Sequence, residues 1–269
     1  MTGARRAFRS EWIKLRRRRL LFGTLGGVVA VEVLITMLTF ATAGVRTGRD
    51  GPNGPGGSVT LAHLATSSGM TYALGQSVTL LGVVAVCVAA AQLATEYTNG
   101  TLRNLLVRQP NRLVLLAGKY LGVASFVALG VVAAAVTSVG VSFLMAGTKG
   151  ISTSQWLSAG GMASGLRTFA NVELAITGYT TIGVFLAVLF RSPIIAIAVG
   201  IAYLLPVENI VAGAVTQSAR FLPGQLLSAI AEGGTSSVGY LWALAGSLLL
   251  CLAMAGLGAG LFQRRDVTS

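Results

Sequence analysis

The residues of this chain that could do chemistry are carboxylates in apolar surroundings. Glu32 lies about twelve residues into an otherwise uncharged apolar run, Leu20 to Phe40. A charge at the centre of a bilayer costs at least about 2.5 kcal/mol, so Glu32 must be protonated, paired or directed at a cavity. It serves either substrate binding and coupling or a hydrogen bond between helices. Glu173 and Glu208 lie near the outer ends of later apolar runs, where water is reachable and a solvated or capping carboxylate is the alternative to a functional one. Glu32 and Glu208 are the candidate residues of a substrate path.

Other kinds of chemistry lack the residues that they need. The sequence has no G-x-x-x-x-G-K-[ST] loop, so the chain does not bind ATP in that manner. The single histidine, His63, has no H-E-x-x-H partner, which disfavours an intramembrane protease. Cys87 and Cys251 lie in apolar runs, far from residues that would complete a metal site or a disulfide framework. We therefore expect neither a metal nor a cofactor in this chain.

The composition is that of a membrane protein. Of 269 residues, 54% are apolar and 10% are charged, whereas soluble domains have about 45–50% and about 25%. A soluble enzyme is therefore excluded. Much of the net charge of +12 lies beside the apolar runs, where basic residues set orientation and contact anionic lipid. The expected partner of this charge is the lipid bilayer and not nucleic acid.

Six apolar runs predict an all-α integral membrane protein with one transmembrane domain over residues 1–269. A helix of roughly 20 apolar residues crosses a bilayer core of about 30 Å. The predicted spans are 20–43, 70–94, 118–146, 171–190, 194–215 and 239–262. Their even number places both termini on one side, where 15 of the 20 Lys and Arg residues also fall. By the positive-inside rule, both termini are predicted to be cytoplasmic.

The fifth span is predicted to be irregular. Residues 192–206 number 15, which as a helix cover only about 22 Å, and Pro206 should break or kink the helix. The following residues, 207–231, are apolar yet carry Glu, Asn, Gln, Arg and Pro. Irregular backbone persists at membrane depth only where helices or a wet cavity cover it. This segment is therefore predicted to be broken or re-entrant on the outer side, with a plain outer loop as the alternative.

The N-terminal residues 1–19 are basic and amphipathic. Phe8, Trp12 and Leu15 fall at i, i+4 and i+7, on one face of a helix, and four arginines follow at 16–19. Such a helix lies along the inner leaflet with its charges among acidic headgroups. The alternative is a simple charge cluster that stops transfer. Both interpretations place the segment in the cytoplasm.

The largest predicted cytoplasmic loop, residues 96–112, contains a short amphipathic helix. Leu102, Leu105 and Leu106 occupy positions i, i+3 and i+4. Arg103 and Arg108 lie beside them, and Pro110 ends the helix. A helix this short cannot bury an apolar stripe by itself, so the stripe meets lipid, the protein's own helices or a partner.

Four motifs along the chain together resemble one family. They are Glu96-Tyr97-x-x-Gly100-Thr101-Leu102-Arg103 with Pro110-x-Arg112, Ser10-Glu11-Trp12-Ile13-Lys14-Leu15, Leu222-Pro223-Gly224, and Phe262-Gln263-Arg264-Arg265-Asp266. They are similar to motifs in the membrane-spanning subunits of type 2 ABC exporters, the permease family that includes bacterial antibiotic and peptide efflux pumps. The resemblance covers the whole chain, and no motif encodes the substrate.

The resemblance implies a multi-pass permease of the bacterial plasma membrane that forms the substrate path of an ATP-driven exporter. The loop would be a coupling helix that docks on a separate ATP-binding subunit, and the N-terminal helix a connecting helix. That subunit would hold ATP and Mg, so the chain itself would not be an enzyme. A second permease chain, identical or similar, would complete the path. The coupling residues implied by the motif and its helix are Glu96, Gly100, Thr101, Leu102, Arg103, Leu105, Leu106 and Arg108.

The alternative function is a proton-coupled secondary transporter that uses Glu32. It is weakened by the lack of a paired intramembrane base or cation. A third class, an intramembrane enzyme, lacks the catalytic pairs. An ATPase that co-purifies with the chain would separate the exporter from both.

The predicted topology is tested with single cysteines at Asn53 and Asn104, in a background without Cys87 and Cys251. Asn53→Cys should react with a membrane-impermeant maleimide added outside the cell. Asn104→Cys should react only after the membrane is opened, because the basic residues hold its loop inside. Labelling of Asn104→Cys from outside would reverse the orientation.

Overall fold

The computed structural model describes residues 8, 12, 18–44, 59–108 and 111–264, and no strand occurs among them. Short helices and 3-10 or π turns connect the long helices. The elements are α2 (Arg18–Thr42), α3 (Leu61–Leu64), η1 (Gly69–Thr71), α4 (Tyr72–Gln76), α5 (Val78–Thr98), α6 (Thr101–Arg108), α7 (Arg112–Lys149), α8 (Ala159–Phe190), α9 (Pro193–Ala202), η2 (Tyr203–Val207), α10 (Glu208–Ala214), η3 (Thr216–Arg220), α11 (Pro223–Ala231) and α12 (Tyr240–Arg264).

Six helical segments are long and apolar enough to cross a membrane, which confirms the predicted all-α, multi-pass membrane fold. The second span begins at Val78 and not near residue 70, because η1 and α4 precede it. α7 and α8 have 38 and 32 residues. Helices of this length are about 57 and about 48 Å long, so both extend beyond a bilayer core of about 30 Å. The six segments are Leu20–Thr42, Val78–Thr98, Arg112–Lys149, Ala159–Phe190, Pro193–Ala214 and Tyr240–Arg264.

α5 and α8 form the centre of the bundle. They are the most enclosed of the spans, whereas α2 and α12 are the least enclosed. Glycines allow their close approach: a Cβ at Gly183 would overlap the backbone of Val86, and a Cβ at Gly82 would overlap the ring of Tyr179. Small residues at helix contacts are a usual means of helix association in lipid.

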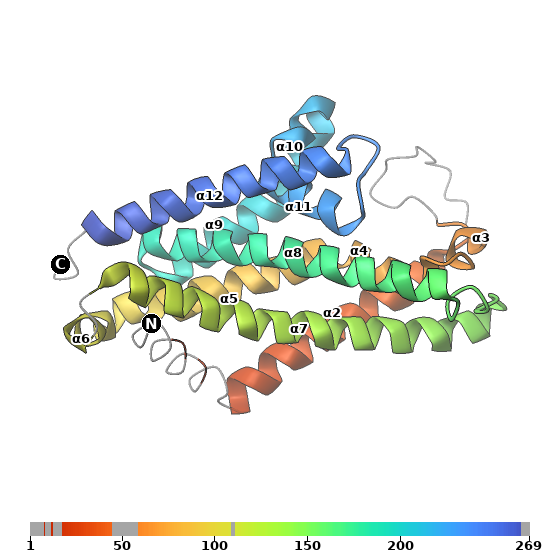
Figure 1. Cartoon of the computed structure of the whole chain (residues 1–269), viewed down its shortest axis with the longest axis horizontal. Coiled ribbons are helices and arrows are strands. Elements are labelled where there is room, and N and C mark those ends of the chain that lie inside the picture. Colours follow the sequence, from red (N-terminus) through yellow and green to blue (C-terminus); the bar gives the residue numbers. More distant parts are fainter. Residues whose placement is uncertain (1–7, 9–11, 13–17, 45–58, 109–110, 265–269) are drawn as a thin grey trace.

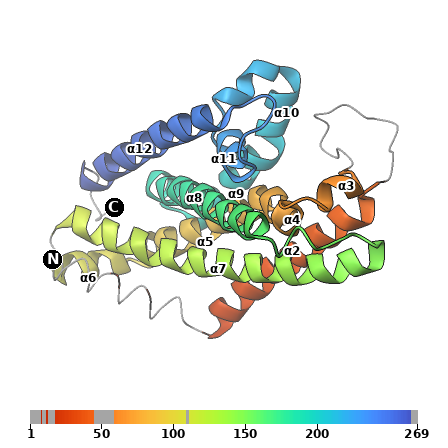
Figure 2. The ribbon, with the colours of Figure 1, turned by 45° about the vertical axis from the view of Figure 1, so that its right-hand side comes forward.

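The two ends of the bundle differ (Figure 1). α6, the start of α7 and the end of α12 lie together at one end, which we call the α6 end. α3 and the connection between α7 and α8 lie at the opposite end, the α3 end. α2 runs obliquely, and its first turns leave the bundle in both views (Figure 2).

A buried tryptophan holds the α3 end together. Trp156 is fully buried in the connection between α7 and α8. Its ring meets Phe40 and Phe143 edge-on, with centroids 6.4 and 5.1 Å away, and its Nε1 donates to the carbonyl oxygen of Leu64 at 2.9 Å. One side chain thus joins the ends of α2 and α7 to α3.

The fifth span is broken near Pro206, as predicted. α9 ends at Ala202, a π turn covers Tyr203–Val207, and α10 follows. The wide turn accommodates Pro206, which has no N–H to donate. After η3, α11 packs on α8 and α12 through a face that includes the buried Leu226 and Ile230. Residues 207–231 are therefore mostly helical, with α11 packed on the spans and α10 largely exposed, which does not fit a plain outer loop.

The predicted N-terminal amphipathic helix, residues 1–19, lies mostly outside the described residues. Phe8 and Trp12 are described as helical, and their rings stack with centroids 6.1 Å apart. Leu15, the third residue of the predicted face, lies outside the described part. Arg18 and Arg19 already belong to α2.

The contact between α5 and α8 is tested by adding one methyl group. Gly183→Ala should lower the free energy of unfolding by about 1–3 kcal/mol, because its Cβ has no space beside Val86 and Ala89. The matched control is Gly140→Ala in α7, where nothing lies within 4 Å of the added Cβ. The control should melt at or above the wild-type temperature, since alanine favours helix. Melting is followed by size-exclusion chromatography of heated, detergent-solubilised protein, and equal melting of the two variants would contradict the contact.

Candidate functional site

The predicted coupling loop begins with a turn that glycine makes possible. α5 ends at Thr98, with Asn99 as its C-cap, and Gly100 has a φ of 65°. This is the left-handed region, which glycine adopts without steric cost. α6 starts immediately afterwards at Thr101. Gly100 therefore reverses the chain at the end of the span and directs α6 back to the bundle.

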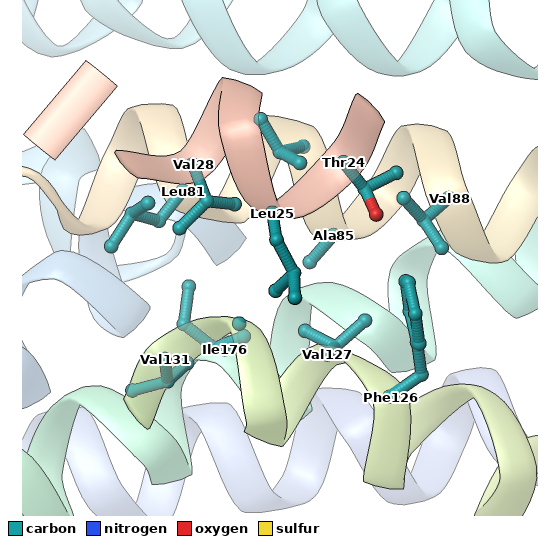
Figure 3. Close-up of a pocket in the computed structure, with 12 residues that line it drawn as sticks. Thr24, Leu25, Val28, Leu81, Ala85, Val88, Phe126, Val127, Val131 and Ile176 are labelled. Carbon is teal, nitrogen blue, oxygen red and sulfur yellow. The ribbon is translucent and has the colours of Figure 1, made fainter. Parts of the chain in front are cut away.

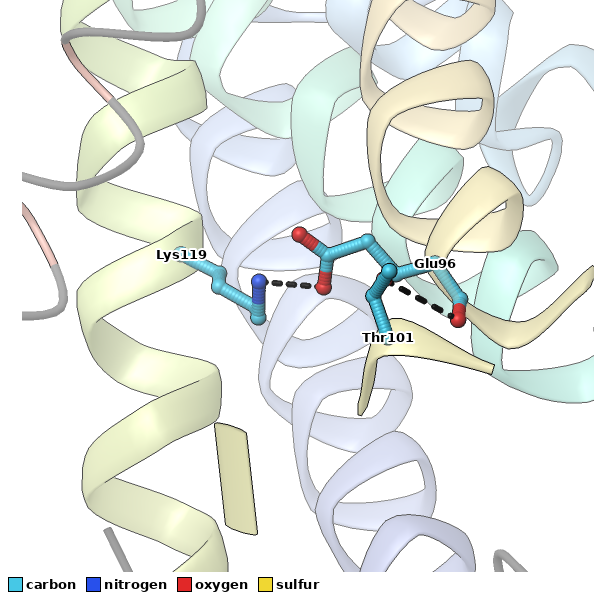
Figure 4. Close-up of polar contacts among 3 residues, drawn as sticks. All are labelled: Glu96, Thr101 and Lys119. Atoms are coloured by element: carbon cyan, nitrogen blue, oxygen red, sulfur yellow. Dashed lines mark hydrogen bonds and ion pairs between the residues drawn. The ribbon is translucent and has the colours of Figure 1, made fainter. Parts of the chain in front are cut away.

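A buried ion pair joins the loop to the third span. The Lys119 Nζ of α7 contacts Oε2 of Glu96, which lies two residues before the end of α5 (Figure 4). The two side chains are only 5% and 9% exposed. The Thr101 hydroxyl donates to the carbonyl oxygen of Glu96 at 3.5 Å, so the same residue also holds the first turn of α6. Removing one partner from such a pair leaves an uncompensated buried charge.

The apolar stripe of α6 meets the protein's own helices. Leu102 is fully buried, and Leu105 and Leu106 are half-buried and pack against the same cluster. This was one of the three possibilities left open by the sequence. Leu102 is therefore closed to a partner, because its side chain is buried within the chain, whereas a docking role for the half-buried Leu105 and Leu106 stays a prediction. The buried members of the cluster are Leu93, Ala94, Leu102, Leu115, Ala187, Val188 and Phe262.

Cations hold the end of α12 in the same corner. Arg112 Nη1 donates to the carbonyl oxygens of Phe262 and Gln263 at 3.3 and 3.0 Å. A cation at a helix C-terminus satisfies free carbonyls and complements the helix dipole. Tyr97 meets the ring of Phe262 edge-on at 6.4 Å, and the guanidinium of Arg191 lies 5.7 Å from the Tyr97 ring centroid. Residues of motifs that are far apart in sequence thus contact one another at the α6 end.

The opposite side of α6 is open. Asn104 is exposed, and Val107 is 81% exposed, the highest value among the exposed large hydrophobic residues. The helix also contains Arg103 and Arg108, whose side chains lie outside the described part of the structure. α6 is therefore a short helix that is anchored on one side and exposes an apolar residue on the other.

Glu208 caps a helix inside the broken segment. Its carboxylate is 1% exposed and accepts hydrogen bonds from the backbone N–H groups of Gly224 and Gln225, at 3.0 and 3.1 Å. These residues open α11, where free N–H groups and the helix dipole favour an anion. A side chain at Gly224 would collide with the Glu208 carboxylate, and Pro223 fits the first helical turn because it has no N–H. The Leu222-Pro223-Gly224 motif thus builds a carboxylate-capped helix start.

Glu32 is also buried, but on other helices. It is 0% exposed on α2, where the hydroxyl of Thr36 donates to its Oε1 at 3.4 Å. Glu208 by contrast contacts the start of α11. The structure thus places the two candidate substrate-path residues at separate helix contacts and does not bring them into one site.

The single histidine lies at the α3 end. His63 is exposed, and its ring meets that of Tyr72 edge-on at 5.3 Å. Burial, and secondly the charge of Glu232, raises the pKa of Tyr72. The raised pKa favours the neutral form of the Tyr72 phenol.

Sequence reasoning missed two residues of the α6 corner. Lys119 is one of the 15 basic residues on the predicted cytoplasmic side, and a lysine seven residues beyond Arg112 in an apolar run needs an anion. Glu96, on the same predicted side, was the available anion. Val107 was not predicted because the spacing of the leucines places the apolar face on the opposite side of the helix. No signal in one sequence separates the covered face of a short helix from its open face.

One family matches the chain. A family described as "Protein of unknown function (DUF2705)" matches residues 54–268, which include every element from α3 to α12 and leave out α2. No curated protein matches the chain.

The Glu96 and Lys119 pair is tested by removing one or both charges. Lys119→Met should lower the free energy of unfolding by about 3–5 kcal/mol, because it leaves Glu96 buried without its cation. The double variant Glu96→Gln with Lys119→Met should recover most of this loss. The readout is the melting temperature in detergent, and a single variant as stable as the wild type would show that the pair is not buried.

Proposed function

We propose that this chain, which belongs to the DUF2705 family, is the membrane-spanning permease of an ATP-driven exporter and couples to a separate ATP-binding subunit through α6. The observation that carries the proposal is the arrangement of α6. It is a helix of eight residues between two spans, buried on one face and open at Val107 on the other. The resemblance to type 2 ABC exporter permeases supplies the partner that such a helix would meet.

The exposed apolar residue of α6 favours a protein partner. Val107 is far more exposed than the leucines on the other face of the helix. Burying such a side chain in a groove contributes roughly 1.5–3 kcal/mol. The arginines at 103 and 108 add positive charge to the same short helix, which suits a groove with an acidic rim and raises the association rate.

The anchored face of α6 supplies a route for coupling. Leu102 belongs to one buried apolar cluster with residues of α5, α7, α8 and α12, and the bond from Thr101 to Glu96 extends through Lys119 to α7. A force on Val107 would therefore move α5, α7, α8 and α12 with α6, and would not be absorbed by a flexible loop. ATP binding then selects one permease state only if the ATPase binds that state better.

The charge distribution supports the cytoplasmic side for α6. The α6 end carries Arg103, Arg108, Arg112, Lys119 and Arg264, and the positive-inside rule then places it where ATP is available. On this proposal the chain lies in the plasma membrane of a bacterium, and a second permease chain, identical or similar, completes the substrate path.

The test compares two exposed apolar residues at opposite ends of the bundle. Val107→Asp should reduce the ATP-binding subunit that co-purifies with the tagged permease by about tenfold or more, since a contact worth roughly 1.5–3 kcal/mol is lost. The ATPase used is the product of a neighbouring gene with a Walker motif, co-expressed with the permease. Leu157→Asp, at a residue 69% exposed in the connection between α7 and α8, is the matched control and should bind the ATPase normally.

Substrate-stimulated ATP hydrolysis in liposomes should fall in parallel with binding. Leu102→Asp distinguishes folding from docking, because it buries a charge in the permease and should lower the permease yield itself. Equal ATPase retention by Val107→Asp and the wild type would refute docking through α6. A wild-type permease that binds no ATPase and transports in response to a proton gradient would favour the secondary transporter.

A further inference from the structure

A fully buried carboxyl lies where α2 meets α7. Glu32 is 0% exposed and stands near the middle of the span Leu20–Thr42. α2 packs mainly on α7, with smaller contacts to α4 and α5. The carboxyl therefore faces the interior of the protein at the depth where a bare charge is least tolerated.

The groups around Glu32 are hydroxyls. Thr36 donates to Oε1 at 3.4 Å, and its oxygen lies 3.5 Å from that of Ser138 on α7. Ser138 and Ser77, the latter at the junction of α4 and α5, also face the carboxyl. These are the groups that face Glu32 from α2, α7 and the junction of α4 and α5, and none of them is titratable or charged. No ion pair to Glu32 occurs in the part of the chain that the structure describes.

One oxygen of the carboxyl lacks a donor. Oε2 of Glu32 is buried and accepts no hydrogen bond in the structure. The hydroxyl of Ser77 already donates to the carbonyl oxygen of Leu74 at 2.9 Å, so its own oxygen is left to accept. An ionised carboxylate can only accept and would leave Oε2 without a partner, whereas a carboxylic acid has an O–H that it can donate to a hydroxyl oxygen.

We propose that Glu32 is a proton-binding site that is occupied while α2 is packed on α7. The acid form satisfies an acceptor-only hydroxyl and removes a charge that no described cation compensates. No covalent step is involved: the proton adds to one carboxylate oxygen and is lost from it to water. The proposal concerns α2 alone and does not depend on the ATPase partner of α6.

A small apolar pocket lies beside this helix contact. An apolar cavity of about 30 Å³ lies between α2, α5 and α7 (Figure 3). It is one helical turn from the hydroxyl cluster, because Val28 precedes Glu32 by four residues and Leu81 follows Ser77 by four. Its walls carry too few polar groups to hold water. Because Glu32 is fully buried and this pocket is apolar, the proposed site exchanges its proton with water when α2 separates from α7. Proton release and separation are then linked, and a rise in pH favours separation.

The test is infrared spectroscopy of the full-length protein in lipid nanodiscs at neutral pH. The difference spectrum between wild type and Glu32→Gln should contain the C=O stretch of a protonated carboxylic acid, above the amide I band and shifted in D2O. Glu173→Gln, which removes another carboxyl from a span, is the matched control and should leave that band in place. Ser77→Ala should shift the band to higher frequency, because the acid loses its acceptor. A wild-type protein without the band would overturn the proposal.

A second measurement needs no variant. Dicyclohexylcarbodiimide reacts with protonated carboxyls in apolar surroundings, and peptide mass spectrometry of the wild-type protein should locate the adduct on Glu32. Loss of both the infrared band and the adduct on addition of Na⁺ would identify a sodium site and overturn the proton assignment. Absence of both signals in sodium-free buffer would show that the carboxyl is ionised.

Discussion

The close contact between α5 and α8 supports the remaining helices. In lipid, apolar side chains gain little by meeting one another, so helices associate through short-range van der Waals contact and buried polar groups. Gly82 and Gly183 allow the backbone and side chains of the two helices to meet at a distance that a Cβ would prevent. α7, α11 and α12 pack on other sides of α8, and α2 packs mainly on α7. The order of enclosure follows from this arrangement, with α2 and α12 the least covered by the other helices.

Three carboxyls show three ways of holding an acid away from water. Glu96 lies against the ammonium of Lys119, and Glu208 lies against the free N–H groups that open α11. Positive charge, or the positive end of a helix dipole, compensates both. Within the described part of the chain, the polar groups that face Glu32 are hydroxyls, and one of its oxygens accepts no hydrogen bond. The difference in partners is the physical basis for proposing a bound proton at Glu32 and not at the other two.

Several contacts hold the helix ends around α6 together. The ion pair, the Leu102 cluster and the bonds from Arg112 to the end of α12 join four spans that are distant in sequence. Most residues of the loop motif therefore act within the chain, and the proposed partner contact is left to the few residues on the open side, above all Val107. A rigid tip suits the proposed coupling role, because a conformational change is transmitted only through elements that move together.

The sequence by itself determined the class of the fold, the number and order of the spans, the break near Pro206 and the position of a short amphipathic helix at 101–108, because these follow from local hydropathy, length and periodicity. Only the tertiary structure decided which face of that helix is covered and that Lys119 forms an ion pair with Glu96. It also decided that Glu32 and Glu208 lie at separate helix contacts. In a chain that is apolar on nearly every face, hydropathy cannot tell a lipid-facing side from a helix contact. That choice depends on close approach at glycines and on which buried polar groups find partners, and both are properties of pairs of helices that are distant in sequence.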